Sequence, residues 1–411
     1  MFRRLTKESL CPHCDPYPAH RAHILEKLEM WFWPLAVLFG ALERRLRQRP
    51  RLHTGVNELA LGGLVRVLLT LDLLKETPAH DADESLHNRS LVVVRAARRR
   101  GLEIKALKFL GRATNYYSAV IDGRKDIFEG LPPLAAAGSR AVDFDDKGTL
   151  KTLLQKAGLP HPRGGVFRHY EAARRYVWRI TGYPVVVKPR SGSLSKHTTC
   201  DIKNDQQLKT AIDVAKIISR DFVVEEYIQG EVYRATLVNG RVAAVCRREP
   251  PNVIGDGLKT VAQLVEIKNR DPKRGAAGQC NFTLHKIVLN PRARALLARQ
   301  GANLDTILAR GQKVYLHDKL TLASGADIHD VTDDIHPAHR ALFEKVAGLC
   351  DAPLLGVDFI APDTTKAPNA QKCAVLEVNS LPYIDMHHYP VTGRPRNVAD
   401  LVLDAYLAAR D

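Results

Sequence analysis

The sequence lacks a long apolar run and a secretory signal. Its first ten residues, Met1–Leu10, are polar and basic, which argues against a cleaved leader at this end. The most apolar stretch, Met30–Leu42, is too short to cross a bilayer and contains Pro34. We therefore expect no membrane span and interpret this stretch as a buried helix, or as an interfacial or partner-facing one.

Cysteine is also scarce. The seven cysteines are odd in number and scattered, which indicates a reducing compartment, the cytoplasm, and argues against a disulfide scaffold. The exception is the pair Cys11 and Cys14, which His20 and His23 follow closely. These four residues could bind zinc, although the two pairs are closer together than in a zinc finger. The alternative is a chain terminus without a metal.

Acidic residues are fewer than basic ones, and the net charge is +16. The sharpest basic cluster, Glu43–Arg51, has no aromatic residue on which bases could stack, so nucleic-acid binding is not expected. A protein that handles nucleotides and acidic substrates accounts for the charge equally well. The serine, histidine and cysteine residues also show no nucleophile–base pattern.

Two short apolar runs near the C-terminus, Leu354–Ile360 and Cys373–Ser380, predict a β-hairpin. Strand alternation places Glu377 and Asn379 on one face, and Asp358 would lie opposite them. Three oxygen ligands at one spot suit Mg²⁺, which fills its other positions with water and nucleotide phosphates. The alternative is a half-buried strand whose polar residues face water.

The N-terminal part of the chain is expected to be helical from about residue 21 to 76. The stretch Asn57–Leu74 carries a broad apolar stripe that other protein must cover. A polar linker, Thr77–Asn88, is followed by a predicted helix over Leu91–Arg100 and a strand over Glu103–Leu107. This order indicates a small α/β domain at residues 88–140, behind a helical extension at 1–76.

A new unit is predicted to begin near residue 145. A helix over Lys147–Ala157 ends at Gly158, and Asn239-Gly240 marks a tight hairpin. The other predicted elements are helices at Tyr170–Ile180 and Gln206–Ile218, and strands at Pro184–Val187, Asp221–Glu225, Tyr233–Val238 and Arg241–Arg247.

The order and spacing of these residues resemble the ATP-grasp ligases, most closely the ATP-grasp half of cyanophycin synthetase. The resemblance runs from about Asn88 to Leu407 and rests on several segments in the same order. They are Lys147, Lys188, Glu225–Glu231, Arg247–Gly257, Thr260–Leu264, Asn269–Gly275, Asp330–Pro337, the strand pair with Asp358, Glu377 and Asn379, and Gly393–Ala399. It implies an α+β fold with the nucleotide between two lobes, at 145–225 and 226–407.

The resemblance implies a role for each matching residue. Mg²⁺, for which Mn²⁺ could substitute, would be held by Asp358, Glu377 and Asn379. ATP would contact Lys147, Lys188, Ser191, Gly192, Ser193, Glu225, Glu226, Tyr227, Ile228 and Glu231, with Glu225 accepting from the adenine amino group. The residues expected to contact the reacting groups are Arg234, Arg247, Arg248, Asp385 and His387. Since Arg247 and Arg248 alternate between faces, at most one of them is expected to touch substrate.

The sequence departs from the family pattern in several places. The given sequence has no counterpart of the Mur-ligase-like half of cyanophycin synthetase. The loop expected over the phosphates has only Gly192, and Val232 stands where an acidic residue would hold the ribose, so we assign that role to Glu231. Asp385 replaces an arginine, which would favour an ammonium or guanidinium group in place of a carboxylate. The alternative for Asp385 is a turn cap.

The implied activity is an ATP-dependent carboxylate–amine ligase that forms a peptide bond through an acylphosphate and releases ADP and phosphate. Its substrates would be amino acids or short peptides. The alternatives are a ligase that modifies a protein or peptide terminus, and a non-catalytic nucleotide- or nucleic-acid-binding protein. A homo-oligomer is left open.

Overall fold

The computed structural model describes residues 74–80, 83–109, 111–132, 134, 144–190 and 197–409. The predicted zinc ligands, the basic cluster at Glu43–Arg51 and nearly all of the helical extension lie outside these residues. At its edge, the expectation that helix continues to Glu76 is wrong. Leu74–Pro78 forms strand β1, because it pairs with a neighbouring strand of the small domain.

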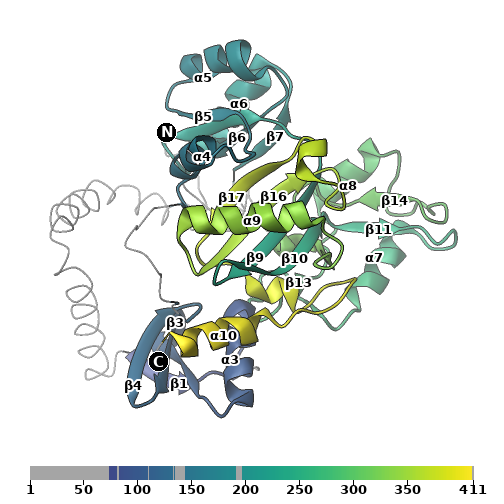
Figure 1. The fold of residues 1–411 in the computed structure, drawn as a ribbon. Helices are drawn as coiled ribbons and strands as arrows, with labels where there is room; N and C mark the ends of the chain where they lie inside the picture. Colours follow the sequence, from purple (N-terminus) through teal and green to yellow (C-terminus); the bar gives the residue numbers. More distant parts are fainter. Residues whose placement is uncertain are drawn as a thin grey trace.

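Figure 1 shows four bodies: a small domain at the bottom, an N-lobe at the top, a C-lobe sheet between them, and an insertion lobe at the side. In the small domain, helix α3 (Asn88–Arg99) packs against an antiparallel sheet. The strands of this sheet, in spatial order, are β1, β2 (Ile104–Phe109), β3 (Arg112–Ile121) and β4 (Arg124–Glu129). The C-terminal helix α10 (Val398–Ala408) returns to this domain and buries Val402 and Tyr406 in the same core.

The N-lobe is a four-stranded antiparallel sheet with helices packed against it. Its order is β5 (Gly164–Phe167), β8 (Phe222–Glu226), β6 (Val185–Pro189) and β7 (Thr199–Ile202). The helices packed against it are α5 (Tyr170–Tyr176), with a π-helical turn over Val177–Thr181, and α6 (Asp205–Ala215). Helix α4 (Lys147–Lys156) precedes β5 in the chain and packs its apolar residues in the C-lobe core. The predicted elements of this lobe are therefore confirmed, with ends that shift by a few residues.

The C-lobe is a five-stranded sheet with helix α9 (Pro337–Cys350) across one face. Its spatial order is β15 (Asp327–Asp330), β10 (Arg241–Glu249), β9 (Glu231–Val238), β16 (Leu354–Ala361) and β17 (Ala374–Asn379). Asn239 and Gly240 both have positive φ, 49° and 73°, which confirms the predicted two-residue turn between β9 and β10. The predicted hairpin of β16 and β17 is also confirmed, with Asp358 opposite Glu377.

The insertion lobe follows β10 and has an apolar core of its own, which includes Val261, Leu297 and Leu308. Its elements are β11 (Asn252–Ile254), α7 (Val261–Asn269), β12 (Arg274–Gly275), β13 (Leu284–His285), α8 (Pro291–Arg299) and β14 (Lys313–Tyr315). The sequence predicted a single lobe over residues 226–407, whereas the structure divides this range into the C-lobe sheet and a separately packed insertion lobe.

No helix among the described residues combines the length and the hydropathy that a membrane span requires.

Candidate nucleotide and metal site

A cavity of about 670 Å³ lies between the N-lobe and the C-lobe. Its wall contains residues of both lobes, and the insertion lobe closes it with residues such as Leu296 and Tyr315. The size is within the range of ligand pockets in proteins. The predicted residues on its wall are Lys147, Lys188, Glu225, Glu226, Tyr227, Ile228, Glu231, Arg248, Asp358 and Glu377. Val232 lies on the wall as well.

Helix α4 connects the two lobes and supplies two cations to the cavity region. Its apolar residues Leu150 and Leu154 pack in the core of the C-lobe beneath α9. Lys147 and Lys151 are four residues apart and therefore lie on one face of the helix. The Lys147 Nζ atom is 3.3 Å from Glu377 Oε1 of the C-lobe, and the Lys151 Nζ atom is 3.1 Å from Glu225 Oε2 of the N-lobe.

Glu225 is buried between two lysines. Its Oε1 atom is 2.6 Å from Lys188 Nζ, and its other oxygen faces Lys151. Burial by itself would raise the pKa of Glu225, but the two lysines outweigh it and hold the pKa below its ordinary value. Burial lowers the pKa of Lys151, whereas Glu225 outweighs burial and raises that of Lys188. Glu225 thus orients two cations, and its predicted contact with adenine stays a prediction.

Two further glutamates after Glu225, Glu226 and Glu231, also line the cavity. Glu226 accepts hydrogen bonds from Arg163 and from Lys372, whose Nζ is 2.8 Å from the Glu226 carboxylate. Because Arg163 precedes β5 and Lys372 precedes β17, Glu226 ties the N-lobe to the C-lobe. Glu231 lines the cavity and lies 3.4 Å from Arg247, and its contact with a ribose stays a prediction.

The predicted metal ligands are side by side on adjacent strands of the C-lobe. Asp358 pairs with Glu377 in the strand register, and Asn379 pairs with Gly356. Asp358 and Glu377 line the cavity, whereas Asn379 is not among its lining residues, and the Nδ2 atom of Asn379 is buried without a hydrogen-bond partner. Hard oxygen donors in this arrangement fit Mg²⁺.

Arg234 and Arg248 both contact Asp358, but in different ways. Arg234 is buried on β9 and donates from Nε and Nη2 to the two Asp358 oxygens, at 2.6 and 2.9 Å. Arg248 on β10 lies 3.6 Å from Asp358 and donates to the carbonyl of Leu320. Burial would raise the pKa of Asp358, yet Arg234 and Arg248 hold it below its usual range.

Of the two neighbouring arginines, Arg248 is the one on the cavity wall. Arg247 points toward Glu231 and Glu249 instead. The predicted alternation is therefore visible in the structure, and a catalytic role for either residue stays a prediction.

Asp385 and His387 lie in a buried 3-10 turn, Ile384–His387, and neither is among the residues that line the cavity. The hydroxyl of Thr283 donates to Asp385 Oδ2, and Thr283 in turn accepts from Asn88 of α3. The second Asp385 oxygen has no partner, and burial raises the pKa of this carboxyl group. His387 contacts Thr236, and burial lowers its pKa to about 3, so it would be a weak base at neutral pH.

Some site residues were missed by the sequence reasoning, and others cannot be placed. Lys151 could have been found from its spacing to Lys147, whereas Asn88 and Thr283 gave no signal because they are far apart in the chain. The predicted phosphate loop residues Ser191, Gly192 and Ser193 lie outside the described residues.

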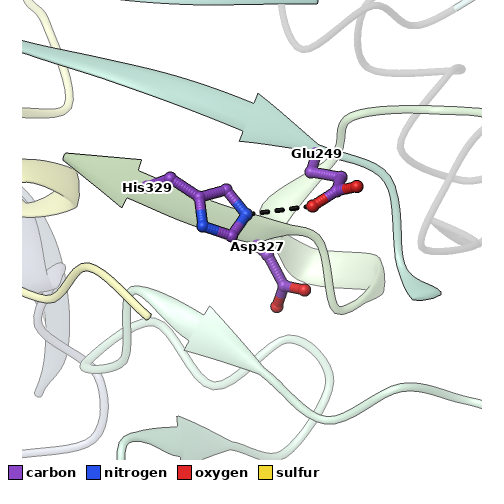
Figure 2. Close-up of side chains that lie close together, drawn as sticks. All are labelled: Glu249, Asp327 and His329. Carbon is purple, nitrogen blue, oxygen red and sulfur yellow. Dashed lines mark hydrogen bonds and ion pairs between the residues drawn. The ribbon is translucent and has the colours of Figure 1, made fainter. Parts of the chain in front are cut away.

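A second acidic cluster lies where the C-lobe sheet meets the insertion lobe. Figure 2 shows Glu249 at the end of β10 with its carboxylate toward His329 on β15, and Asp327 beside them. Their ligand atoms lie within 4.8 Å of one another, which is close enough to bind a metal. All four carboxylate oxygens, however, already have donors: His329, Lys313 and Tyr315 on Glu249, and Arg274, Lys268 and Asn252 on Asp327. We therefore interpret the cluster as a structural ion-pair network.

This arrangement, two lobes with a nucleotide-sized cavity between them and paired oxygen donors on the C-lobe, is the architecture of the ATP-grasp class. The comparisons with known proteins agree with it. The bifunctional glutathione synthetase of Pasteurella multocida superposes with a TM-score of 0.61 at 26% identity, covering 79% of this chain and 44% of that one. The chain has the ATP-grasp fold, as the motifs predicted.

Within that class the chain is related to cyanophycin synthetase. It is 38% identical over 261 residues to the Synechocystis sp. (strain PCC 6803) enzyme, which is 63% of this chain and 30% of the relative. The glutathione biosynthesis bifunctional protein GshAB of Streptococcus mutans is 34% identical over 264 residues, 63% of this chain and 34% of that one. The chain thus spans about a third of the length of these relatives. No family model matches it.

Proposed function

We propose that this protein is an ATP-dependent carboxylate–amine ligase that forms a peptide bond through an acylphosphate. The observation that carries the proposal is the interlobe cavity, in which Lys147 and Lys188 face the oxygen donors Asp358 and Glu377. Phosphoryl transfer requires positioning and charge neutralisation more than covalent help from the protein, and this wall offers both. The relationship to cyanophycin synthetase and to the glutathione proteins supports the same class of reaction.

Each group has a part in the proposed reaction. Mg²⁺, held by Asp358, Glu377 and Asn379, would supply Lewis-acid stabilisation of the phosphates. Lys188 is oriented toward the cavity by Glu225 and would bind phosphate oxygens. The carboxylate of the first substrate takes the γ-phosphoryl group, and the amine of the second then displaces phosphate from the acylphosphate.

The substrates are proposed to be amino acids or short peptides, and the compartment the cytoplasm. The described cysteines are all free, which agrees with a reducing environment. Asp385 is proposed to favour an acceptor that carries a positive charge, since one of its buried oxygens has no partner.

The test is a phosphate-release screen with ATP, Mg²⁺ and pairs of amino acids or dipeptides, followed by hydroxylamine trapping. With the correct acid, hydroxamate should form without the amine, and Lys188→Ala should abolish it. Release of AMP and pyrophosphate would show a different mechanism. Nucleotide binding without turnover on any free acid, but with turnover on a protein or peptide terminus, would favour the alternative ligase.

A further inference from the structure

A second cavity, of about 310 Å³, lies beside helix α3 of the small domain. One wall is a face of α3, on which Val92, Arg95 and Arg99 follow one another at helical spacing. The other wall is the segment 388–397, which joins the buried 3-10 turn to α10. Among the described residues, none lines both this cavity and the interlobe cavity. The second cavity, which we call the arginine cavity, is therefore a separate site that the proposed reaction does not use.

The wall of the arginine cavity carries positive charge. Its polar lining residues are Arg95, Arg99, His388, Tyr389, Arg396 and Asn397. No carboxylate is found among the described residues that line it, whereas in the interlobe cavity carboxylates stand beside the lysines. A wall of cations without an acid favours an anionic ligand.

Two of the three arginines are held by carboxylates that lie outside the arginine cavity. Arg396 donates from Nε and Nη2 to Asp330, at 3.0 and 2.8 Å, and from Nη2 to Asp333 at 2.6 Å. Arg99 donates from Nη2 to Asp400 at 3.1 Å. Within the described part of the chain, Nη1 of Arg396 and both Nε and Nη1 of Arg99 have no partner. Each guanidinium group thus keeps donors for a ligand.

The third arginine, Arg95, is half-buried and is oriented by a chain of hydrogen bonds. Its Nη1 atom donates to the Tyr389 hydroxyl at 2.6 Å and to Asn88 Oδ1 at 3.2 Å. The amide of Asn88 is fixed in this orientation, because its Nδ2 atom donates to Thr283 Oγ1 at 2.7 Å. The Thr283 hydroxyl in turn donates to Asp385. A guanidinium group that is positioned in advance loses little freedom when it binds a ligand.

The other polar side chains of the arginine cavity add hydrogen-bond donors. His388 accepts at Nε2 from the backbone N–H of Ala399 at 3.1 Å. Burial lowers the pKa of His388 to about 4, so at neutral pH the ring is uncharged and its proton is on Nδ1. The Tyr389 hydroxyl accepts from Arg95 and keeps its own proton for donation. The side-chain oxygen of Asn397 already accepts from the backbone of α10.

We propose that the arginine cavity binds a small oxyanion, with Arg95 and Arg99 on one wall and Arg396 on the other. The anionic group is a carboxylate or a phosphate, because planar guanidinium groups pair with either through parallel hydrogen bonds. The arginine cavity has less than half the volume of the interlobe cavity, which suits a compact ligand and not a nucleotide.

The test is calorimetric titration of the full chain with two probes, inorganic phosphate and succinate. About 0.15 M sodium chloride in the buffer screens the attraction that the net charge alone would cause. Wild type should bind at least one probe saturably. Binding of phosphate identifies a phosphate site and binding of succinate a carboxylate site, and either result supports the proposal. No saturable binding of either probe up to about 10 mM would overturn it.

Two substitutions locate the bound probe. Arg95→Gln and Arg99→Gln should each weaken binding by about tenfold, because a charge-assisted hydrogen bond is lost. Neither arginine lines the interlobe cavity, so a probe bound there would not respond. Arg124→Gln, which changes an exposed arginine on β4 of the same domain, is the matched control and should bind as wild type does. Equal affinity in all four proteins would overturn the proposal.

A third variant separates a built site from attraction by charge. Arg95→Lys keeps the positive charge but lacks the planar fork, so it should bind the probe about threefold or more weakly than wild type. Binding as tight as that of wild type would show that charge alone attracts the probe, and the proposed site would be wrong. If Arg95→Gln does not fold, Arg99→Gln, whose side chain is 56% exposed in wild type, decides the matter. No nucleotide is present in these titrations, so the oxyanion site and the proposed ligase activity can fail separately.

Discussion

Two clusters of buried charge in this molecule look alike at first and differ in one respect. In the cluster of Glu249, Asp327 and His329, every carboxylate oxygen has a donor. None of these three residues lines the interlobe cavity, although Tyr315, which contacts Glu249, does. Asp358 and Glu377 both line the interlobe cavity, although Asp358 also has a donor on each of its oxygens. Each cluster has a buried arginine Nε atom without a partner, on Arg274 in the first and on Arg248 in the second. A place on the wall of a cavity, and not burial of charge or an unpartnered donor, marks the site that can accept a ligand.

The first cluster also explains how the insertion lobe is attached. Lys268 of α7, Arg274 of β12 and Lys313 of β14 all reach back to Asp327 or Glu249 on the C-lobe sheet. The lobe has its own apolar core, so these ion pairs fix its position and not its folding. Since the lobe closes one side of the cavity, this structural cluster supports the functional one indirectly.

The largest expected effect is on stability, at the first cluster. Asp327→Asn removes the carboxylate that both Lys268 and Arg274 contact and leaves the buried charge of Arg274 without its partner, which should lower the free energy of unfolding by about 3–5 kcal/mol. Chemical denaturation measures it, and Asp305→Asn, an exposed residue of the same lobe, is the control. A loss of unfolding free energy no larger than that of the control would mean that the network does not stabilise the fold.

The second effect is on turnover, at the other cluster. Glu377→Gln should reduce the rate of ligation by about 100- to 1000-fold, or ~3–4 kcal/mol, because a charge that stabilises the transition state is lost. The melting temperature should stay near that of wild type, since Glu377 is partly exposed. A variant that keeps more than half of the activity would remove Glu377 from the proposed metal site.

The third effect is a dependence of stability on pH. The hydrogen bond with His329 is the main cause that lowers the pKa of Glu249 from 4.5 to about 2. A lowered pKa stabilises the fold fully above the unfolded value near 4.5, and this contribution is lost as the pH falls toward 2. By pH 3 wild type should lose about 2 kcal/mol that Glu249→Gln does not lose. Equal losses in the two proteins, measured by denaturation at pH 7 and pH 3, would contradict the assignment.

The smallest effect concerns the acceptor. Asp385→Asn should raise the KM for the amine substrate by about tenfold, equivalent to ~1.4 kcal/mol, and leave the KM for ATP nearly unchanged. The neutral isostere keeps the hydrogen bond from Thr283 but no longer attracts a cation. Equal weakening of both substrates, or of neither, would show that Asp385 does not select the acceptor.

The local elements and the order of the motifs could be predicted from near neighbours in the chain. Alternating apolar runs predicted β16 and β17 and the opposition of Asp358 and Glu377, and Asn239-Gly240 predicted the turn after β9, because these signals depend only on near neighbours. The resemblance of the motifs predicted the ATP-grasp fold. The prediction of helix at Leu74–Glu76 was wrong because the apolar periodicity of the preceding stretch was extended into these residues. They pair with β2, and this pairing joins segments that are distant in the chain.

Which charged residues pair with one another depends on the tertiary fold. Nothing in the spacing of Lys147 and Glu377, or of Arg234 and Asp358, indicates that they pair, because each pair joins segments more than 100 residues apart. The separate core of the insertion lobe and the contact of Asn88 with Thr283 are long-range in the same way. Charge pairing depends on distance in space, which a linear sequence does not carry.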